Sequence, residues 1–162
     1  MAERSVAELF HEAMASLASG VCVVTARRAD GDPCGLSATA VASYSADPPS
    51  LLVSIDHRSR CHDALAGSAR FGVHILGANE EPLARAFASK GHDKFAGLDW
   101  RWDGDVPELD RALAYLRCVR AENFQRYDHT ILIGDLDGGR LDPGDPLLYS
   151  QRRMDWLLQT GG

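Results

Sequence analysis

Apolar side chains near the start of the chain recur at the spacing of an α-helix. Ser5 and Glu8 have the three-residue spacing of a capping box at the start of this helix, and Gly20 is typical of a helix C-terminus. The apolar positions fall three or four residues apart, on one helix face. They are Val6, Leu9, Phe10, Ala13, Met14 and Leu17. The pattern predicts a helix that packs this face on a sheet.

From residue 21 the pattern changes to the short β-branched and apolar runs of strands. Strands are predicted at residues 21–27, 35–45 and 50–56, with an Asp-Gly turn at residues 29–32. Pro48 and Pro49 end the second strand, since proline cannot donate to a ladder. Three strands joined by short turns indicate an antiparallel meander rather than βαβ units.

The second half of the chain mixes short helices with further strands. Helices are predicted at residues 61–67, capped by Ser59, and at 79–89, capped by Asn79 with Pro82 in the first turn. Strands are predicted at residues 70–76, 100–103, 112–123, 130–137 and 147–151, with turns at 138–139 and 142–146. A helix is the alternative at 112–123, but a hairpin with 130–137 is preferred. Leaving aside the short stretch 100–103, the chain has six or seven predicted strands, depending on 112–123, with two or three flanking helices. This predicts a mainly β fold, a closed or nearly closed barrel.

Composition narrows the class of protein. The chain has 162 residues, which suits one domain over 1–162, and a formal net charge of −6. That charge argues against nucleic acid or an anionic membrane as the main partner. No apolar run approaches the roughly 20 residues of a membrane helix, and the N-terminus lacks a signal-peptide pattern. Because Cys22, Cys34, Cys61 and Cys118 are widely spaced, we expect free thiols in a reducing cytoplasm.

Small side chains between Gly35 and Asp47 leave the backbone open to a flat polar ligand. The residues concerned are Ser37, Ala38, Thr39, Ala40 and Val41. The structural alternative is that they only fill a crowded barrel strand. A phosphate needs hydroxyls, backbone N–H groups and a cation. The strand end and helix start that follow supply these with Ser54, Asp56, Ser59, Arg60 and Cys61, and a loop adds Lys90 and Lys94.

No metal site is expected. His57 and His62 lie five positions apart, and a metal site there is only the lesser alternative because few ligands have suitable spacing. The chain shows no catalytic triad and no paired carboxylates.

Seven segments together carry a family resemblance. They include GLSATAVASYSADPPSLLVSID at 35–56, RSRCHDAL at 58–65, LARAFASKGHDKF at 83–95 and YDHTILIGDL at 127–136. The others lie at residues 10–26, 70–76 and 146–153. In this order and spacing the chain resembles the flavin reductase-like family, the reductase components of two-component flavin monooxygenases.

The resemblance implies a split β-barrel of Greek-key antiparallel strands that binds FMN, or FAD, as a homodimer. It implies NADH or NADPH as co-substrate and a separate monooxygenase that receives reduced flavin. His129 matches the histidine of an Asp-His motif near the nicotinamide, with Asp128 fixing its tautomer. Tyr149, Arg152 and Arg153 match a C-terminal strand that lines the cofactor site. The rival readings are a pyridoxamine-phosphate-oxidase-like enzyme and a non-catalytic flavin- or haem-binding module.

Overall fold

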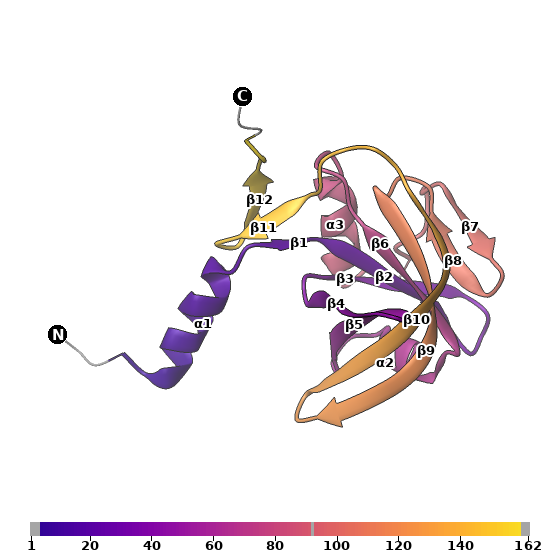
Figure 1. Cartoon of the computed structure of the whole chain (residues 1–162), viewed down its shortest axis with the longest axis horizontal. Coiled ribbons are helices and arrows are strands. Elements are labelled where there is room, and N and C mark those ends of the chain that lie inside the picture. Colours follow the sequence, from indigo (N-terminus) through magenta and orange to yellow (C-terminus); the bar gives the residue numbers. More distant parts are fainter. Residues whose placement is uncertain (1–3, 92, 160–162) are drawn as a thin grey trace.

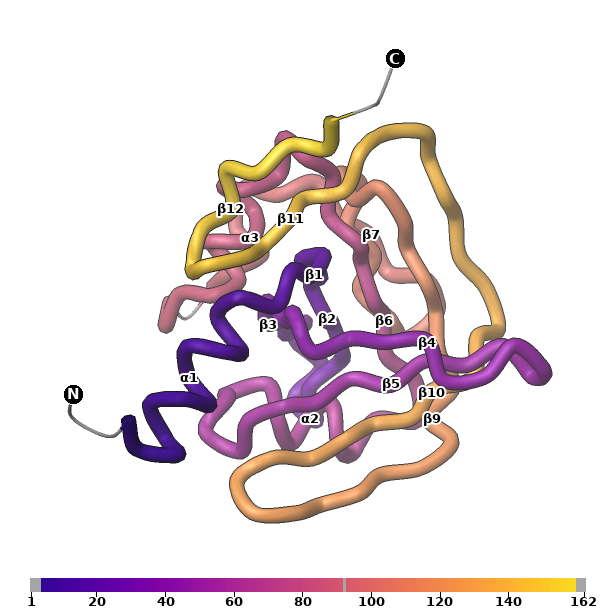
Figure 2. Tube along the Cα trace, turned by 60° about the vertical axis from the view of Figure 1, so that its left-hand side comes forward, coloured from indigo at the N-terminus to yellow at the C-terminus, as the bar shows by residue number. Residues whose placement is uncertain are grey.

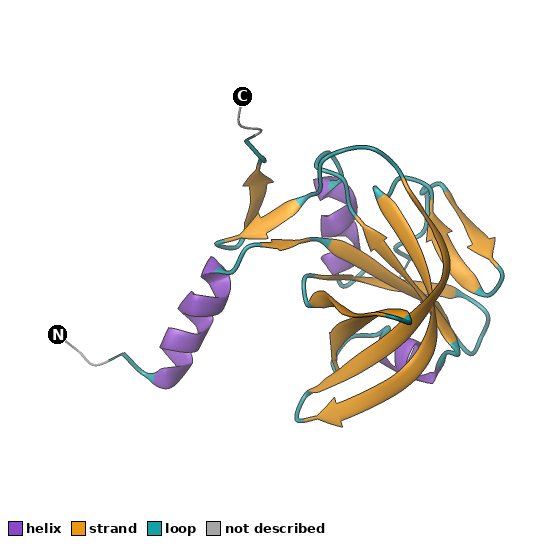
Figure 3. Cartoon of the chain, viewed as in Figure 1, coloured by secondary structure: helices purple, strands orange, loops and turns teal. Residues whose placement is uncertain are grey.

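Strands dominate the computed structural model, which describes residues 4–91 and 93–159 (Figure 1, Figure 3). The helices in this part of the chain are α1 (Val6–Ser16), α2 (His62–Gly67) and α3 (Glu81–Ala88). The strands are β1 (Ser19–Gly20), β2 (Cys22–Arg27), β3 (Pro33–Ala38), β4 (Val41–Ala46), β5 (Pro49–Asp56), β6 (Arg70–Ile75), β7 (Trp100–Asp103), β8 (Val106–Leu109), β9 (Ala114–Arg126), β10 (His129–Leu141), β11 (Leu148–Ser150) and β12 (Arg153–Trp156). The predicted mainly β fold is confirmed.

Seven strands form one antiparallel sheet in the order β3-β2-β6-β9-β10-β5-β4. Its longest members are β9 and β10, which form the predicted hairpin and are followed most easily in Figure 2. Strands β3 and β4 occupy opposite edges although only Thr39 and Ala40 separate them. So short a connection spans about 10 Å, so the sheet must curl until its two edges approach each other. Within the described residues no ladder joins β3 to β4, and the curled sheet stays open there.

Strand β2 is buried on both faces, which explains its nearly continuous apolar run. Val24 packs inside the curled sheet with Phe71 and Ile55. Val23 points the other way, into a second cluster that contains Phe87 of α3. The core therefore has two layers, one enclosed by the sheet and one between β2 and α3.

Helix α1 differs from its prediction in two ways. Its capping box is present, with the Ser5 hydroxyl accepting from Glu8 N and the Glu8 carboxylate accepting from Ser5 N. The helix ends at Ser16, however, and Gly20 lies in β1 instead of terminating the helix. No α1 residue is buried, so the predicted packing of its apolar face on a sheet is wrong. Figure 1 shows why: α1 stands apart from the curled sheet, beside β1 and the β11–β12 hairpin.

The predicted strand over residues 35–45 is two strands. β3 pairs with β2 up to Ala38, whereas β4 pairs with β5 from Val41 onward. The break lies at residues 39–40, where the chain leaves one edge of the sheet for the other. Continuous small and apolar residues hid this change of partner.

Residues 138–139 are not the predicted turn but lie inside β10. The β9–β10 register shifts between Leu136 and Gly138, which marks a β-bulge. Gly139 has φ +153°, and a Cβ there would collide with the backbone oxygen of Tyr115. Glycine therefore allows the bulge that bends this long strand.

Both interior helices start later than predicted. Cys61 and Glu80 occupy the N-cap positions of α2 and α3 without a side-chain cap, so neither Ser59 nor Asn79 caps a helix. Pro82 does lie in the first turn of α3. The predicted strand count was also too low, because β1, β8 and β12 are only two to four residues long. No helix in the described chain has the length and apolar character needed to cross a membrane.

A buried histidine ties the sheet to the β7–β8 hairpin. His74 is fully buried in β6; its Nδ1 donates to Val23 O at 3.1 Å, and its Nε2 accepts from Leu109 N at 3.1 Å. Both bonds need a neutral ring with the proton on Nδ1. Burial lowers the pKa of His74 from 6.5 to about 3, although the bond to Val23 opposes this change.

We expect this histidine to make the fold sensitive to acid. Between pH 6.5 and about 3 the unfolded chain protonates this histidine and the folded chain does not. The free energy of unfolding therefore falls with decreasing pH, by up to about 1.4 kcal/mol per pH unit for this one proton. Urea unfolding of wild type and His74→Gln between pH 7 and 4 measures the difference in slope. Equal slopes in the two proteins would contradict the assignment.

Candidate functional site

Two cavities adjoin along β3. The larger has a volume of about 1060 Å³ and the smaller about 270 Å³. Leu36, Ser37, Asp56 and Ser59 border both of them. A long ligand therefore has room to extend from one cavity into the other, and the two differ in chemistry.

The smaller cavity is lined mainly by backbone and small side chains. Its border takes in the end of β3, residues 39–40 and the end of β5, including Ala38, Thr39, Ala40 and Ser54. Because β3 is an edge strand, one of its sides carries N–H and C=O groups outside the ladder. The Ser37 hydroxyl donates to Ala84 O of α3 at 2.5 Å and is thus engaged with the fold. Along β3, the groups that could bind a ligand are therefore mainly backbone N–H and C=O groups.

His129 borders the smaller cavity from the first position of β10. Its Nδ1 lies 2.9 Å from Asp128 Oδ1, and this hydrogen bond lowers the pKa of the Asp128 carboxyl. A carboxylate only accepts, so the bond places the imidazole proton on Nδ1. Nε2 remains available to a ligand.

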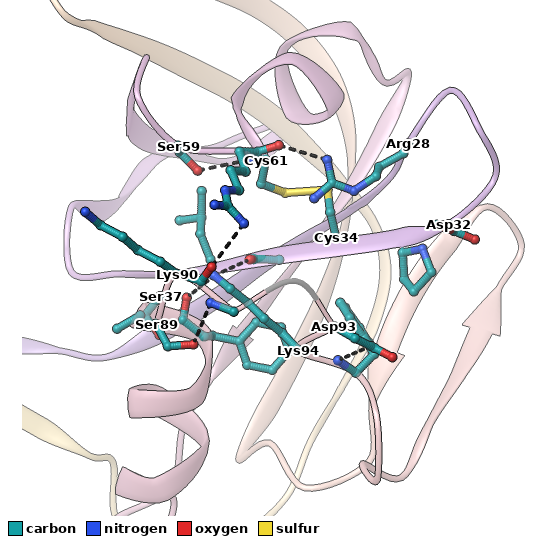
Figure 4. A pocket seen from close by; sticks show the side chains of 18 of the residues that line it. Arg28, Asp32, Cys34, Ser37, Ser59, Cys61, Ser89, Lys90, Asp93 and Lys94 are labelled. Carbon is teal, nitrogen blue, oxygen red and sulfur yellow. Dashed lines mark hydrogen bonds between the residues drawn. A yellow bond between two sulfur atoms is a disulfide. The ribbon is translucent and has the colours of Figure 1, made fainter.

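Among the described residues, five cations and four aspartates border the larger cavity, and three of the cations lie close to one another. Arg28, Arg60 and Lys94 all border it, and Figure 4 shows Arg28 and Lys94 on different walls. The Nη1 of Arg60 donates to Lys90 O at 3.0 Å, and the Nζ of Lys94 donates to Phe87 O at 2.6 Å. Burial, and then the charges of Arg28 and Arg60, lower the pKa of Lys94. Such crowding of positive charges favours the binding of an anion.

The Asp56 carboxylate accepts hydrogen bonds within the turn that leads into this cavity. The backbone N of Arg58 donates to its Oδ1 at 2.8 Å, and the guanidinium Nη2 donates to its Oδ2 at 2.7 Å. These bonds hold the pKa of Asp56 well below its ordinary range. One turn later the Ser59 hydroxyl accepts from Cys61 N at 3.2 Å. The carboxylate thus fixes the conformation of the segment that presents Ser59 and Arg60.

The expectation of four free thiols is wrong, because Cys34 and Cys61 form a disulfide. Their Cα atoms are 5.8 Å apart although 27 positions separate them in sequence. Only the fold brings them together, through the approach of β3 to the start of α2. Cys22 and Cys118 are free and buried, as expected, and burial raises the pKa of each thiol to about 12.

Gly35 allows the close packing of α3 against the cavity wall. A Cβ at this position would lie 2.6 Å from Cε1 of Phe87. The carbonyl oxygen of Gly35 also accepts from Lys94 Nζ at 3.3 Å. The same residue therefore fits the core on one side and positions a cavity lysine on the other.

Five predicted site residues border neither of these two cavities, and one of them, Arg153 at the start of β12, forms an ion pair with Asp155. Val41 pairs with Val53 in β4, and Asp128 contributes only through His129. Tyr149 lies in β11 opposite Ser19, and Arg152 lies in the β11–β12 turn with φ +61°. The structure brings the other predicted residues together around the two cavities.

The two histidines considered for a metal share a different role. The Nε2 atoms of His57 and His62 lie 3.1 and 2.9 Å from the Thr130 hydroxyl. His62 Nδ1 is 2.9 Å from Asp63 Oδ1. These contacts join α2 to β10. Within the described chain no group of three or more His, Cys, Asp and Glu residues could hold a metal ion.

Sequence reasoning missed Arg28, Cys34 and Phe87 on the border of the larger cavity. Arg28 follows β2 directly and precedes a turn, a position where a solvated arginine is ordinary. Cys34 had no partner at short sequence spacing. Neither Arg28 nor Cys34 belongs to a sequence pattern that would identify it as a site residue.

Comparison with known proteins decides the family. The model of the flavin reductase like domain matches residues 14–158. The chain belongs to the flavin reductase-like family. The member from Streptomyces pristinaespiralis called NADH:riboflavin 5'-phosphate oxidoreductase is 41% identical over 149 residues, covering 89% of this chain and 84% of that protein.

Two further members of the flavin reductase-like family extend the comparison. The reductase component of a 4-nitrophenol 4-monooxygenase/4-nitrocatechol 2-monooxygenase from Rhodococcus opacus is 34% identical, covering 90% of this chain and 78% of that protein. The NADH:FAD oxidoreductase of Streptomyces globisporus, solved with NAD and FAD fragments, superposes with a TM-score of 0.85 at 27% identity. That structure covers 94% of this chain, and this chain covers 93% of it. The resemblance in the seven segments is confirmed.

Proposed function

We propose that this flavin reductase-like protein is an NADH-dependent flavin reductase that uses FMN or FAD, with NADPH as the alternative donor. The observation that carries the proposal is that a cavity bordered by the backbone of β3 adjoins a larger, charged cavity in which Arg28, Arg60 and Lys94 lie close together. A flavin nucleotide has a flat polar ring at one end and phosphate toward the other, and this order of surfaces suits it. The curled sheet, whose two edge strands are connected by residues 39–40 alone, supports the split β-barrel of the family as its architecture.

We assign the residues that border the cavities to two groups, one for the flavin ring and one for the phosphate. We place the flavin ring against the backbone of Ser37–Val41 and the end of β5, and the phosphate near Ser59, Arg60, Lys90 and Lys94. When bound, the nicotinamide and flavin supply the hydride transfer themselves. The protein holds the two rings in contact and keeps His129 Nε2 turned to the reacting ligands. Tyr149 and Arg152 remain predictions, since they lie on the β11–β12 hairpin.

Nicotinamide oxidation tests the proposal directly. NADH and NADPH are offered in turn with FMN, FAD or riboflavin, and loss of the nicotinamide absorbance is followed. We expect flavin-dependent oxidation, faster with NADH. Tight flavin binding without any turnover would overturn the enzyme and favour the binding-module reading. Oxidation of pyridoxamine phosphate without nicotinamide would favour the other rival.

We also propose a separate flavin-dependent monooxygenase as the recipient of reduced flavin. The support is the relative from Rhodococcus opacus, a named reductase component of a monooxygenase. The larger cavity is bordered by exposed residues of the turn that contains Asp30 and Asp32 and of the loop residues 89–91. A site of this kind suits a flavin that is exchanged and not permanently enclosed.

The partner of helix α1 is, we propose, a second copy of the chain. Leu9, Phe10 and Met14 are 55%, 59% and 49% exposed, and they form one contiguous apolar stripe. Exposed apolar stripes of this size mark interaction surfaces. Helix α1 stands beside the β11–β12 hairpin (Figure 1), and Leu157 and Leu158, which follow β12, are also exposed. A homodimer would bury both, and it would give α1 the packing that its sequence pattern predicts.

A double substitution tests this interface. Leu9→Glu with Phe10→Glu places charge on the stripe while keeping good helix formers. We expect the dimer to dissociate, with its dissociation constant raised by about 100-fold or more. Sedimentation equilibrium measures the change, and His11→Glu, off the stripe, is the matched control. A wild-type protein that is monomeric at micromolar concentrations would contradict the proposal.

A further inference from the structure

The Cys34–Cys61 disulfide joins two walls of the larger cavity. Cys34 lies in β3 next to Gly35, and Cys61 ends the turn that carries Ser59 and Arg60. Both cysteines border the cavity although each is only 2–3% exposed (Figure 4). The cavity is therefore the route by which a small thiol reaches the sulfur atoms.

Non-covalent contacts add to this link but do not replace it. Arg28 Nη1 donates to Arg60 O at 2.9 Å, and Arg60 Nη1 donates to Lys90 O at 3.0 Å. These bonds run between groups that are partly exposed and compete with water. The disulfide is the one covalent tie between β3 and the turn at residues 57–61 in the described chain.

The disulfide restrains the residues that we assign to phosphate binding. Ser59 and Arg60 precede Cys61 directly, and the backbone N of Cys61 donates to the Ser59 hydroxyl. A crosslink that fixes Cys61 against β3 restricts this turn before any ligand arrives, which lowers the entropy lost on binding. Cleavage removes the covalent link to β3 and leaves the turn held by hydrogen bonds, among them those of Arg58 to Asp56 and of His57 N to Asp128 O.

We propose that Cys34 and Cys61 form a reversible dithiol–disulfide site that sets the affinity of the larger cavity for phosphorylated flavins. The inference rests on the proposed phosphate site at Ser59 and Arg60. The oxidised protein binds FMN or FAD tightly, and the reduced protein binds them weakly. Riboflavin, which lacks the phosphate, binds both forms alike.

The chemical step is ordinary thiol–disulfide exchange with a dithiol. One thiolate of the dithiol attacks a sulfur of the Cys34–Cys61 bond, forming a mixed disulfide and releasing the other cysteine as a thiolate. The second dithiol sulfur then closes a disulfide within the reductant and releases the remaining cysteine. Two electrons pass to the cysteine pair, two protons complete its thiols, and the dithiol is oxidised.

Thermodynamic linkage gives a reciprocal effect. If the oxidised form binds FMN more tightly, FMN must stabilise the oxidised form by the same factor. A bound phosphate would also block the cavity through which the dithiol enters. We therefore expect FMN to protect the disulfide from reduction, and riboflavin to protect it much less.

Flavin titration of the oxidised and the dithiothreitol-reduced full-length protein tests the proposal. Mass spectrometry after thiol alkylation confirms each redox state. We expect the dissociation constant of FMN to rise by about tenfold on reduction, with that of riboflavin changing by less than about twofold. Cys34→Ser should bind FMN like the reduced wild type in the absence of any reductant. Cys118→Ser, buried and outside the cavity, should keep the wild-type response.

The outcomes separate the proposal from its premise. Equal FMN affinity in both redox states, with FMN still favoured over riboflavin, overturns the redox site and leaves the phosphate site standing. Equal affinity for FMN and riboflavin in the oxidised protein overturns the phosphate site, and the redox proposal with it. Alkylation of all four cysteines without a reductant also overturns the proposal. Because wild-type protein supplies the main comparison, the conclusion does not depend on the folding of a variant.

Discussion

His129→Ala is expected to lower kcat/KM for NADH by about 100-fold, the cost of misplacing reacting groups. His129 borders the cavity assigned to the flavin ring, and its Nδ1 bond to Asp128 leaves Nε2 for the nicotinamide. Because we place the flavin ring against backbone groups of β3 and β5, we expect the dissociation constant of FMN to change by less than about threefold. Steady-state kinetics with NADH and flavin titration measure the two effects.

Two variants from the same turn sharpen this test. Asp128→Asn removes the carboxylate that fixes the imidazole tautomer, so a smaller loss, of about tenfold, is expected. Tyr127→Ala is the matched control, because Tyr127 is 85% exposed and borders neither cavity. An unchanged kcat/KM in His129→Ala would remove this histidine from the proposed mechanism.

Arg60→Ala is expected to weaken FMN binding by about 30-fold, as for loss of a charge-assisted bond to phosphate. The guanidinium of Arg60 borders the cation-rich cavity and, with Arg28, lowers the pKa of Lys94. Its removal leaves less positive charge for the phosphate. Riboflavin carries no phosphate, so its dissociation constant should change by less than about threefold. Fluorescence titration with each flavin measures the ratio.

The chain provides a control two positions away. Arg58 borders the same cavity, but its guanidinium is paired with the Asp56 carboxylate and its side chain is 86% exposed. Arg58→Ala should therefore weaken FMN by less than about threefold. Equal losses for Arg58→Ala and Arg60→Ala would mean that the overall positive charge, and not a specific contact, attracts the phosphate.

The fold was predictable where the pattern is local. The β9–β10 hairpin and the α1 capping box follow from alternation and spacing within about a dozen residues. The break of the 35–45 strand was not predictable, because both halves have small and apolar side chains and differ only in their pairing partners. The packing of α1 failed for a similar reason. Its apolar stripe predicts burial, but in the described chain these side chains are exposed, and spacing alone does not say which surface could cover them.

Part of the candidate site was predictable from the sequence, and part of it depends on the fold. Ser37, Ser59 and Arg60 were found because their segments carry a recognisable order of residue types, and the structure gathers them around adjoining cavities. The Cys34–Cys61 bond depends on where β3 approaches α2. Such an approach is a property of the curled sheet as a whole. A sequence motif cannot carry it, because the two cysteines share no local pattern.

Gly35 is constrained both by the packing of Phe87 and by the hydrogen bond from Lys94. A side chain there would displace Phe87, whose ring fills the core between β2 and α3 and whose carbonyl holds Lys94. Any substitution at position 35 would therefore disturb both the core packing and the position of Lys94. Directed evolution of flavin preference should consequently find little room at position 35. Adaptive change is more accessible at Lys90, which borders the same cavity with an exposed side chain.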